Sequence, residues 1–369
     1  MRPDTENRHY RYPLKIKDHT EYQGIIYEPG RVTRIILNRP RYMNALSHPM
    51  WAEVEDAFDR AAGDDECNVI VVSGNGKCFS AGDDVIGLSP EGAPMLADRR
   101  TPEQLIKDYG SEKEVWHQYN IEHDHMITWL PLHKLRTNPK PTIAMAHGYC
   151  IYGGLNLAAA MDVIFSSEDA LFLWGGLAGG GGVLWDLGLR KAYELVLEHR
   201  CLTAREAQEY HLVNRVYPDH QILEKETLAY AERVASEPPT RVRRVKQQLL
   251  ALMDYRGFTS GQEALRTPSS QIWRDMAADA RLRYDGKGIA RIPVALYNLK
   301  AKLDSEGQLV PDNVQGALVR AAERDDRAKW QEALHQSWRD PKRVARVEAQ
   351  YKEFLETEKA ERERKKHQV

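Results

Sequence analysis

The stretch Phe79-Ser80-Ala81-Gly82-Asp83-Asp84-Val85 and its counterpart His147-Gly148-Tyr149-Cys150-Ile151-Tyr152-Gly153-Gly154-Leu155-Asn156 decide the fold and indicate the chemistry. Each follows a short apolar run typical of a buried strand, 68–73 before the first and 141–146 before the second. Two such turns can direct backbone N–H groups at one point, which is the arrangement that holds a developing oxyanion. The pair therefore predicts chemistry on a carbonyl group, through an enolate or a tetrahedral intermediate.

Short apolar runs alternate with helical patterns on both sides of these turns. The runs 22–27 and 32–37 flank Glu28-Pro29-Gly30 and predict a hairpin. Ser47 is placed to cap a helix over 48–62, whose apolar residues share one face. Strands are expected over 68–73, 141–146 and 162–166, with a helix from Gly154 to Ala160. This recurrence of strand, turn, helix and strand favours an α/β fold.

With Leu37-Asn38-Arg39-Pro40 and Met43-Asn44-Ala45-Leu46 upstream, the two turns resemble the crotonase (enoyl-CoA hydratase/isomerase) superfamily over residues 20 to 300. The resemblance implies a spiral of ββα repeats followed by a helical region. The divisions expected are an irregular arm over 1–20, a crotonase-like core over 21–225, a helical trimerisation-type region over 226–300 and a charged helical extension over 301–369. A homotrimer or a hexamer is also implied.

By position in the family pattern, the oxyanion donors are the backbone amides of Asp83 and Gly153. Glycine at position 153 lets the backbone approach the ligand closely. The helix that opens at Gly154 adds its N-terminal dipole to the same oxygen. Such donors stabilise the charge that gathers on a thioester oxygen when a proton leaves the α-carbon. In the alternative interpretation, these glycines serve only the turn and the packing of the helix.

The resemblance also implies binding of coenzyme A near the first motif. The basic side chains available there for its phosphates are Arg39, Arg41 and Lys77. Further contacts are expected at Ala45, Ala81 and Asp84. Each basic residue has an alternative interpretation as a solvated surface charge, and Asp84 has one as a structural cap.

The two glutamates of the family's hydratases, which together activate and protonate water, are missing from their expected positions. The first position is Asn156. An amide has no proton to exchange near neutral pH, so it cannot be a general base. The second region, 172–182, is rich in glycine and contains no carboxylate, and its glycine run is expected to be a turn that leads into a helix at Val183. Hydration by the usual pair of glutamates is therefore not expected.

Asp186 and His123 are the candidates that remain for proton transfer. Asp186 follows the glycine run closely enough to take over a catalytic position, and the alternative is a solvent-facing helix residue. His123 belongs to the segment 116–125, the richest in titratable groups, which by resemblance borders the acyl group. An imidazole there can act as acid or base near pH 7, and the alternative is an ordinary packed or surface histidine.

Two segments depart from the ordinary family pattern. The long polar connection between residues 84 and 139 corresponds to the substrate-covering loop, and its length predicts an enlarged lid over an unusual acyl group. The alternative is an inert surface insertion. Beyond residue 300, amphipathic helical patterns predict packing on the core or on a neighbouring subunit, with a charge-rich solvated helix as the alternative.

Composition excludes several classes of function. A formal net charge of -2 gives no reason to expect binding to nucleic acid or to an anionic membrane. The cysteines at 67, 78, 150 and 201 have no CxxC spacing, so they indicate neither a disulfide framework nor a zinc site. Residues 1–18 lack the apolar stretch of a signal peptide, and no later run is long enough to span a membrane. The expected compartment is the cytoplasm.

The sequence thus predicts a crotonase-like enzyme that stabilises a thioester enolate. The reaction is hydration, isomerisation or, because the glutamates are missing, hydrolytic C–C cleavage or ring opening of a cyclic or aromatic acyl-CoA. Coenzyme A enters as part of the substrate, and no metal or redox cofactor is expected. The alternative is a catalytically impaired acyl-CoA-binding or assembly protein, which would bind the thioester without turnover.

Overall fold

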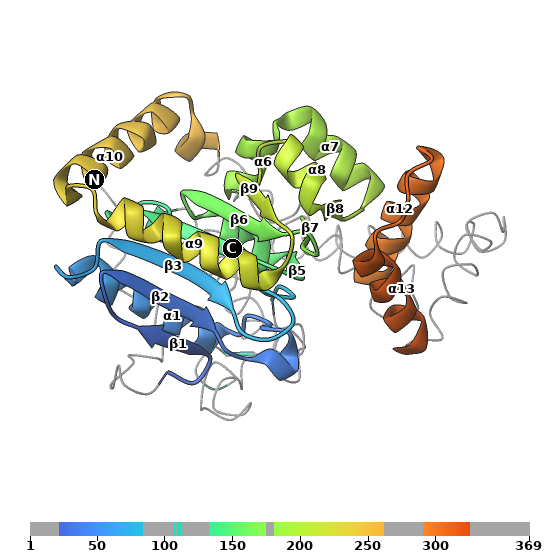
Figure 1. Ribbon diagram of the computed structural model, residues 1–369, viewed down its shortest axis with the longest axis horizontal. Helices are drawn as coiled ribbons and strands as arrows, with labels where there is room; N and C mark the ends of the chain where they lie inside the picture. Colours follow the sequence, from blue (N-terminus) through green and yellow to red (C-terminus); the bar gives the residue numbers. More distant parts are fainter. Residues whose placement is uncertain are drawn as a thin grey trace, which may run out of the picture. The chain divides into compact units, whose positions relative to one another are not determined.

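The computed structural model describes residues 22–83, 107, 110–111, 133–174, 181–261 and 291–324 (Figure 1). Several predicted features lie outside these residues. They are the N-terminal arm over 1–20, most of the connection 84–139, the glycines at 175–180 and the tail beyond 324.

The described core is built on a mixed sheet with the strand order β1-β2-β3-β4-β6-β9. Only the β1–β2 pair is antiparallel, and it forms the predicted hairpin. The other neighbours are parallel. The strands are β1 (Ile25–Glu28), β2 (Val32–Leu37), β3 (Val69–Gly74), β4 (Thr142–Ala146), β6 (Val163–Ser167) and β9 (Arg215–Tyr217). Parallel neighbours require crossover connections, and this produces the α/β architecture predicted from the sequence.

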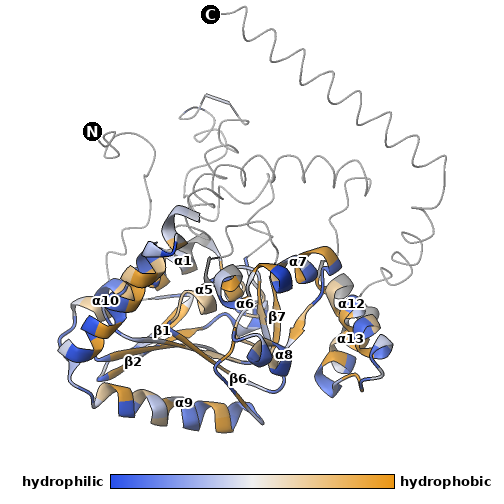
Figure 2. Cartoon of the chain, turned by 90° about the horizontal axis from the view of Figure 1, so that it is seen from above, coloured by the Kyte–Doolittle hydropathy of each residue, from blue (hydrophilic) through white to orange (hydrophobic). Residues whose placement is uncertain are grey.

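Alternate residues of the central strands face two different helical layers. In β3, Val69 and Val71 pack in the cluster that contains Leu223 of α9 (His220–Ala235). Ile70 and Val72 pack in the cluster of α1 (His48–Gly63). Figure 2 shows the sheet between α9 and α1. Because successive strand side chains point to opposite faces, a strand covered on both faces is apolar throughout, as the run 68–73 indicated.

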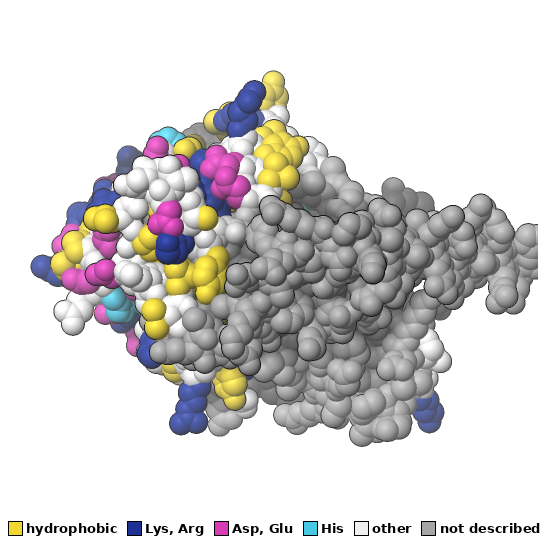
Figure 3. Space-filling model, turned by 90° about the vertical axis from the view of Figure 1, so that its right-hand side faces the viewer, with side chains coloured by type: hydrophobic (Ala, Val, Ile, Leu, Met, Phe, Trp, Pro, Cys, Tyr) yellow, Lys and Arg dark blue, Asp and Glu magenta, His cyan; other side chains and the backbone are white. Residues whose placement is uncertain are grey.

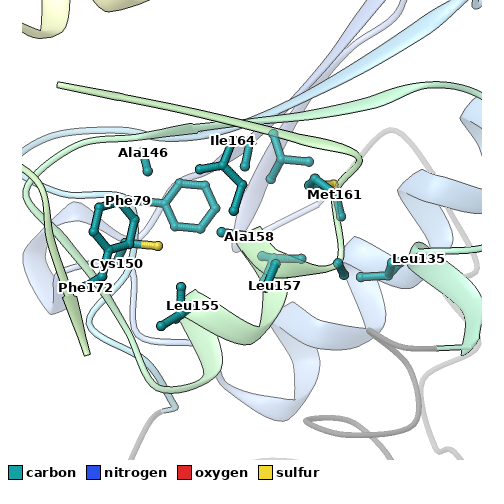
Figure 4. Close-up of a cluster of buried hydrophobic side chains, with 14 of the residues drawn as sticks. Phe79, Leu135, Ala146, Cys150, Leu155, Leu157, Ala158, Met161, Ile164 and Phe172 are labelled. Carbon is teal, nitrogen blue, oxygen red and sulfur yellow. The ribbon is translucent and has the colours of Figure 1, made fainter. Parts of the chain in front are cut away.

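A second sheet has the strand order β5-β7-β8 and lies beside the short helix α5. Its strands are β5 (Tyr149–Ile151), β7 (Leu171–Leu173) and β8 (Leu202–Thr203), and α5 runs over Gly153–Ala159. Figure 4 shows apolar side chains of α5 packing with Phe79, Cys150 and Phe172. These side chains are buried in one cluster, so the position of α5 is fixed by the core.

The remaining helices follow in chain order. They are η1 (Pro40–Tyr42), α6 (Gly181–Leu187), α7 (Leu189–Glu198), α8 (Ala204–Glu209), α10 (Pro239–Tyr255), α12 (Arg291–Ser305) and α13 (Asp312–Arg324). Contacts divide the chain into the units 1–270 and 271–369, and α12 packs on α13 within the second unit. The domain limits expected at 225 and 300 stay predictions; α9 and α12 span these two positions.

Observed element ends lie close to those read from the sequence. Ser47 caps α1 as expected, since its side chain accepts a hydrogen bond from the Met50 N–H. α5 begins at Gly153, one residue before the predicted start. α6 begins at Gly181 and not at Val183, where the end of the glycine run was expected to give way to a helix. Glycine weakens a helix through backbone entropy, which is why the sequence pattern placed the start too late.

No helix in the described part of the chain is long and apolar enough to cross a membrane. On the face shown in Figure 3, acidic, basic and hydrophobic side chains of the described residues are interspersed. That face carries no large region of a single charge.

A buried asparagine joins the two loops that lead to the motif Phe79 to Asp83. The Asn44 side chain donates to the carbonyl oxygens of Asn75 and Cys78, at 2.9 and 2.8 Å, and its Oδ1 accepts from the Arg39 N–H at 2.8 Å. Asn44 has a φ of 51°, in the left-handed region that asparagine tolerates better than most residues. The side chain therefore holds the two loops side by side.

Replacement of Phe165, which packs in β6 with its ring against Tyr217 and Tyr230, tests the layer between the sheet and α9. Phe165→Ala is expected to lower the free energy of unfolding by about 3–5 kcal/mol, through lost burial and a residual cavity. Tyr255→Ala, at a side chain that is 90% exposed, is the control and should change it by less than about 0.5 kcal/mol. Urea denaturation measures both, and equal effects would contradict the packing described.

Asn44→Ala should lower the free energy of unfolding by about 3 kcal/mol, because it leaves two carbonyl groups and one N–H unpaired in a buried place. Asn75→Ala is the matched control, since among the described residues the Asn75 side chain donates to Asn38 Oδ1, in an exposed hydrogen bond. Thermal melting of the two variants measures the difference. If both melt at the same temperature, the Asn44 side chain does not join the loops.

Candidate functional site

Three chain segments run side by side at the candidate site, and backbone hydrogen bonds connect them. The Ala81 N–H donates to the Met43 carbonyl at 2.9 Å, and the Leu46 N–H donates to the Gly82 carbonyl at 2.8 Å. On the other side, the Ser80 N–H donates to the Tyr149 carbonyl at 2.8 Å. The motif 79–83 is therefore held between the segments 43–46 and 149–151.

The two glycine turns approach each other too closely to admit side chains. Gly82 has a φ of 90°, and a Cβ there would lie 2.8 Å from the Tyr152 Cβ. A Cβ on Gly153 would lie 2.7 Å from Cγ of Asp83. Both distances are too short for non-bonded carbon atoms. The glycines therefore serve the packing of the turns, as the alternative interpretation required, and this packing brings the two predicted donor residues together.

The Asp83 side chain lies against Gly153 and is surrounded by N–H groups. Burial raises the pKa of this carboxyl to about 6, while the Trp51 indole and the backbone N–H groups of Asp83 and Gly153 act in the opposite direction. Both predicted oxyanion donors thus act on the same carboxyl group. The two predicted donor residues therefore lie close together, which is compatible with an oxyanion site.

Asp186 belongs to α6, which packs against α5. Burial raises the pKa of the Asp186 carboxyl to about 6, and the Arg136 guanidinium lowers it by a smaller amount. Arg136 also donates from Nη1 to the carbonyl oxygen of Ala159, the last residue of α5, at 2.9 Å. Asp186 is therefore not the solvent-facing residue of the alternative interpretation. A carboxyl group with this pKa can both accept and return a proton near neutral pH.

Aromatic side chains also lie near Arg136 and Asp186. The Arg136 guanidinium lies 4.6 Å from the Phe258 ring centroid, and that ring meets Trp185 edge to face at 5.3 Å. Trp174 is buried within the main hydrophobic cluster, which favours the packing role for it. Asn156 lies one turn into α5, and its backbone N–H donates to the Tyr152 carbonyl at 2.9 Å.

The residues predicted to contact coenzyme A lie on neighbouring loops. Asn38 and Asn75 join these loops, since the Asn75 Nδ2 donates to the Asn38 Oδ1 at 2.9 Å. Arg41 and Lys77 are exposed, whereas Arg39 donates to the Ala45 carbonyl at 2.6 Å. Their arrangement leaves Arg41 and Lys77 accessible to an anionic ligand.

Two predicted site residues, His123 and Asp84, lie outside the described residues. Sequence reasoning missed Trp51, Ser80 and Arg136. The Ser80 hydroxyl donates to the Asn44 carbonyl at 2.8 Å and accepts from the Gly82 N–H at 3.1 Å. Ser80 belongs to the first glycine motif but no role was assigned to it, and Trp51 and Arg136 come near the site residues only through tertiary contacts. In the described part of the chain, no group of His, Cys, Asp and Glu side chains could hold a metal ion.

Comparison with known proteins agrees with this geometry. Two family models described as enoyl-CoA hydratase/isomerase match residues 32–178 and 112–276. The mitochondrial Delta(3,5)-Delta(2,4)-dienoyl-CoA isomerase of Rattus norvegicus is 30% identical over 258 residues, which are 66% of this chain and 74% of the relative. A putative enoyl-CoA hydratase of Thermus thermophilus is 33% identical over 61% of this chain and 83% of the relative.

Solved structures show the same fold. A probable enoyl-CoA hydratase from Mycobacterium smegmatis has a TM-score of 0.56 and 30% identity, over 70% of this chain and 96% of that one. An enoyl-CoA hydratase/isomerase from Xanthobacter autotrophicus Py2 has a TM-score of 0.56 and 26% identity, over 83% of this chain and 99% of that one. The chain therefore belongs to the enoyl-CoA hydratase/isomerase family, within the crotonase superfamily.

Proposed function

We propose that this protein is a CoA-thioester isomerase, which moves a carbon–carbon double bond of an acyl-CoA by transferring a proton through an enolate. The observation that carries the proposal is the half-buried carboxyl of Asp186, with its pKa raised to about 6, on a helix packed against α5. Enzymes of this family act on acyl-CoA thioesters, and one relative is named as a dienoyl-CoA isomerase.

The proposed chemistry needs one group that first accepts and then returns a proton. Ionised Asp186 removes a proton from the acyl chain, and the electron pair delocalises onto the thioester oxygen. The backbone N–H groups of Asp83 and Gly153 stabilise the resulting negative charge. The protonated Asp186 then returns the proton at another carbon of the conjugated system, so the double bond moves and no atom is gained or lost.

Hydration would need more than this arrangement offers. Water must be deprotonated as it attacks one carbon while a second group protonates the neighbouring carbon. Asn156, at the position of the first family glutamate, can orient a water molecule or a carbonyl group but cannot exchange a proton. The Asp83 carboxyl lies beside the proposed donor Gly153, so in the proposed site it would face the thioester oxygen and not the carbon chain.

Substrate binding is proposed to follow the expectations from the sequence. The exposed Arg41 and Lys77 support contacts to the phosphates of coenzyme A, with Arg39 positioning the loop through Ala45. Asp84, Ala81 and His123 remain proposed participants, and no separate cofactor is proposed. All four cysteines are free thiols, which agrees with the reducing cytoplasm proposed as the compartment.

A homotrimer or a hexamer is the proposed assembly. Three apolar side chains on α7, Leu189, Tyr193 and Leu197, are exposed at four-residue intervals, which places them on one helix face. The α10 side chains Leu249 and Leu252 are also exposed. Apolar helix faces of this kind support contacts between subunits.

The reaction type is tested by incubating the protein with 3-enoyl-CoA, 3,5-dienoyl-CoA and cyclic β-keto acyl-CoA thioesters in ¹⁸O-water. An isomer of unchanged mass, detected by its ultraviolet absorbance and by chromatography, is expected from the unsaturated substrates. A labelled water adduct would show hydration, and a labelled ring-opened acid would show C–C hydrolysis. Thermal stabilisation by thioesters that all remain unchanged would show a binding protein.

Asp186→Asn is expected to lower kcat by at least about 100-fold, because the amide cannot accept the proton. In the unmodified protein, kcat at saturating thioester should rise with pH through about 6, since the carboxyl must be ionised to act as the base and burial raises its pKa to that value. Asp254→Asn, on the exposed face of α10, is the matched control. If Asp186→Asn keeps full activity, another residue must transfer the proton.

A further inference from the structure

We propose that the Asp83 side chain is an internal ligand of the oxyanion donors, and that a thioester binds productively only after this carboxyl is protonated or displaced. The inference rests on the proposed function, because it takes the two converging amides as the thioester site. It assigns Asp83 a second role, in which its side chain controls access to the N–H groups that its own backbone helps to supply.

The geometry places the carboxyl where the substrate oxygen must go. Its Cγ lies 2.7 Å from the position that a Cβ on Gly153 would take, so the side chain is in contact with the backbone of that residue. The N–H groups of Asp83 and Gly153 both favour its ionised form. A carboxylate oxygen and a thioester enolate oxygen are both anionic acceptors. The donors that attract one are therefore the donors that the other needs.

The Asp83 carboxyl is poorly satisfied in its hydrogen bonding. Its Oδ1 is buried and has no hydrogen-bond partner among the described residues. The neighbours that act on it are the Trp51 indole from α1 and the backbone of Gly153 from α5, and no charged side chain of the described residues contributes. A buried carboxylate without a cation beside it is costly. Apart from the Trp51 indole, the neighbours that favour the ionised side chain are therefore the proposed oxyanion donors, and one carboxylate oxygen is left without a partner.

Ionised Asp83 must oppose the reaction whether it stays or leaves. If it stays, its negative charge lies beside the charge that develops on the enolate, and like charges in a buried place repel strongly. If it leaves, the favourable interaction of the carboxylate with the two amides is lost. Protonated Asp83 carries neither cost and can itself donate to the thioester oxygen. Binding should therefore weaken as Asp83 ionises, with rising pH.

Equilibrium binding of butyryl-CoA measures this effect without turnover, because this thioester has the carbonyl group but no double bond to move. Calorimetry between pH 5 and pH 8 should show affinity for the unmodified protein falling by about 10- to 100-fold, as linkage predicts for a group that titrates near pH 6 and must be neutral in the complex. Asp83→Asn should bind with nearly constant affinity, at least about 10-fold tighter than the unmodified protein at pH 8.

Two further variants isolate the cause. Asp65→Asn removes one negative charge at an exposed position, and it should keep the full pH dependence. Asp186→Asn should also keep it, because that carboxyl does not lie at the amides. Thermal melting verifies that each variant is folded. Should Asp83→Asn fail to fold, the pH profile of the unmodified protein still decides, because constant affinity between pH 5 and pH 8 overturns the inference.

Two further outcomes distinguish a failure of this inference from a failure of the proposed function. If butyryl-CoA binds the unmodified protein and Asp83→Asn with the same pH dependence, the inference is wrong and the proposed function stands. If butyryl-CoA binds neither protein at any pH, the amides are not a thioester site, and the proposed function falls together with this inference.

Discussion

The close approach of two backbone turns is the constraint on which the site depends. The turn that contains Gly82 presses against Tyr152, and Asp83 presses against Gly153, with no room for a Cβ at either glycine. Hydrogen bonds of Ser80 and the buried Asn44 fix the position of the first turn. The apolar cluster around α5 fixes the position of the second turn (Figure 4). The proximity of the two predicted donor residues follows from this packing.

Removal from water raises the pKa of two carboxyl groups at the candidate site. Asp83 and Asp186 both have a carboxyl pKa raised to about 6 by burial, but their neighbours differ. Backbone and indole N–H groups surround Asp83, whereas the Arg136 guanidinium accompanies Asp186. One carboxyl can therefore control the oxyanion donors while the other carries a proton. Two groups with similar pKa values acquire different roles from where they are placed.

Local sequence patterns predicted the helices and strands that carry the site, with small errors in where they begin. The continuous apolar run of β3 and the Ser47 cap of α1 were recognisable because burial on both faces and helix capping leave signatures in adjacent residues. The start of α6 was predicted too late, and this shows the limit of local patterns. The glycines that begin this helix suggested a turn, while tertiary contacts allowed a helix. Trp51 and Arg136 left no local signature of a site role, since their partners there are distant in the chain.

The sequence by itself determined the α/β class and the crotonase resemblance, and it predicted the two donor positions and Asn156 in place of a hydratase carboxylate. Each of these depends on residue identity and spacing along a short segment. Only the tertiary structure decided that Asp186 is half-buried beside Arg136 and that the Asp83 side chain lies on Gly153. Burial and the approach of distant backbone segments set a pKa and a contact, and neither is a property of neighbouring residues in the chain.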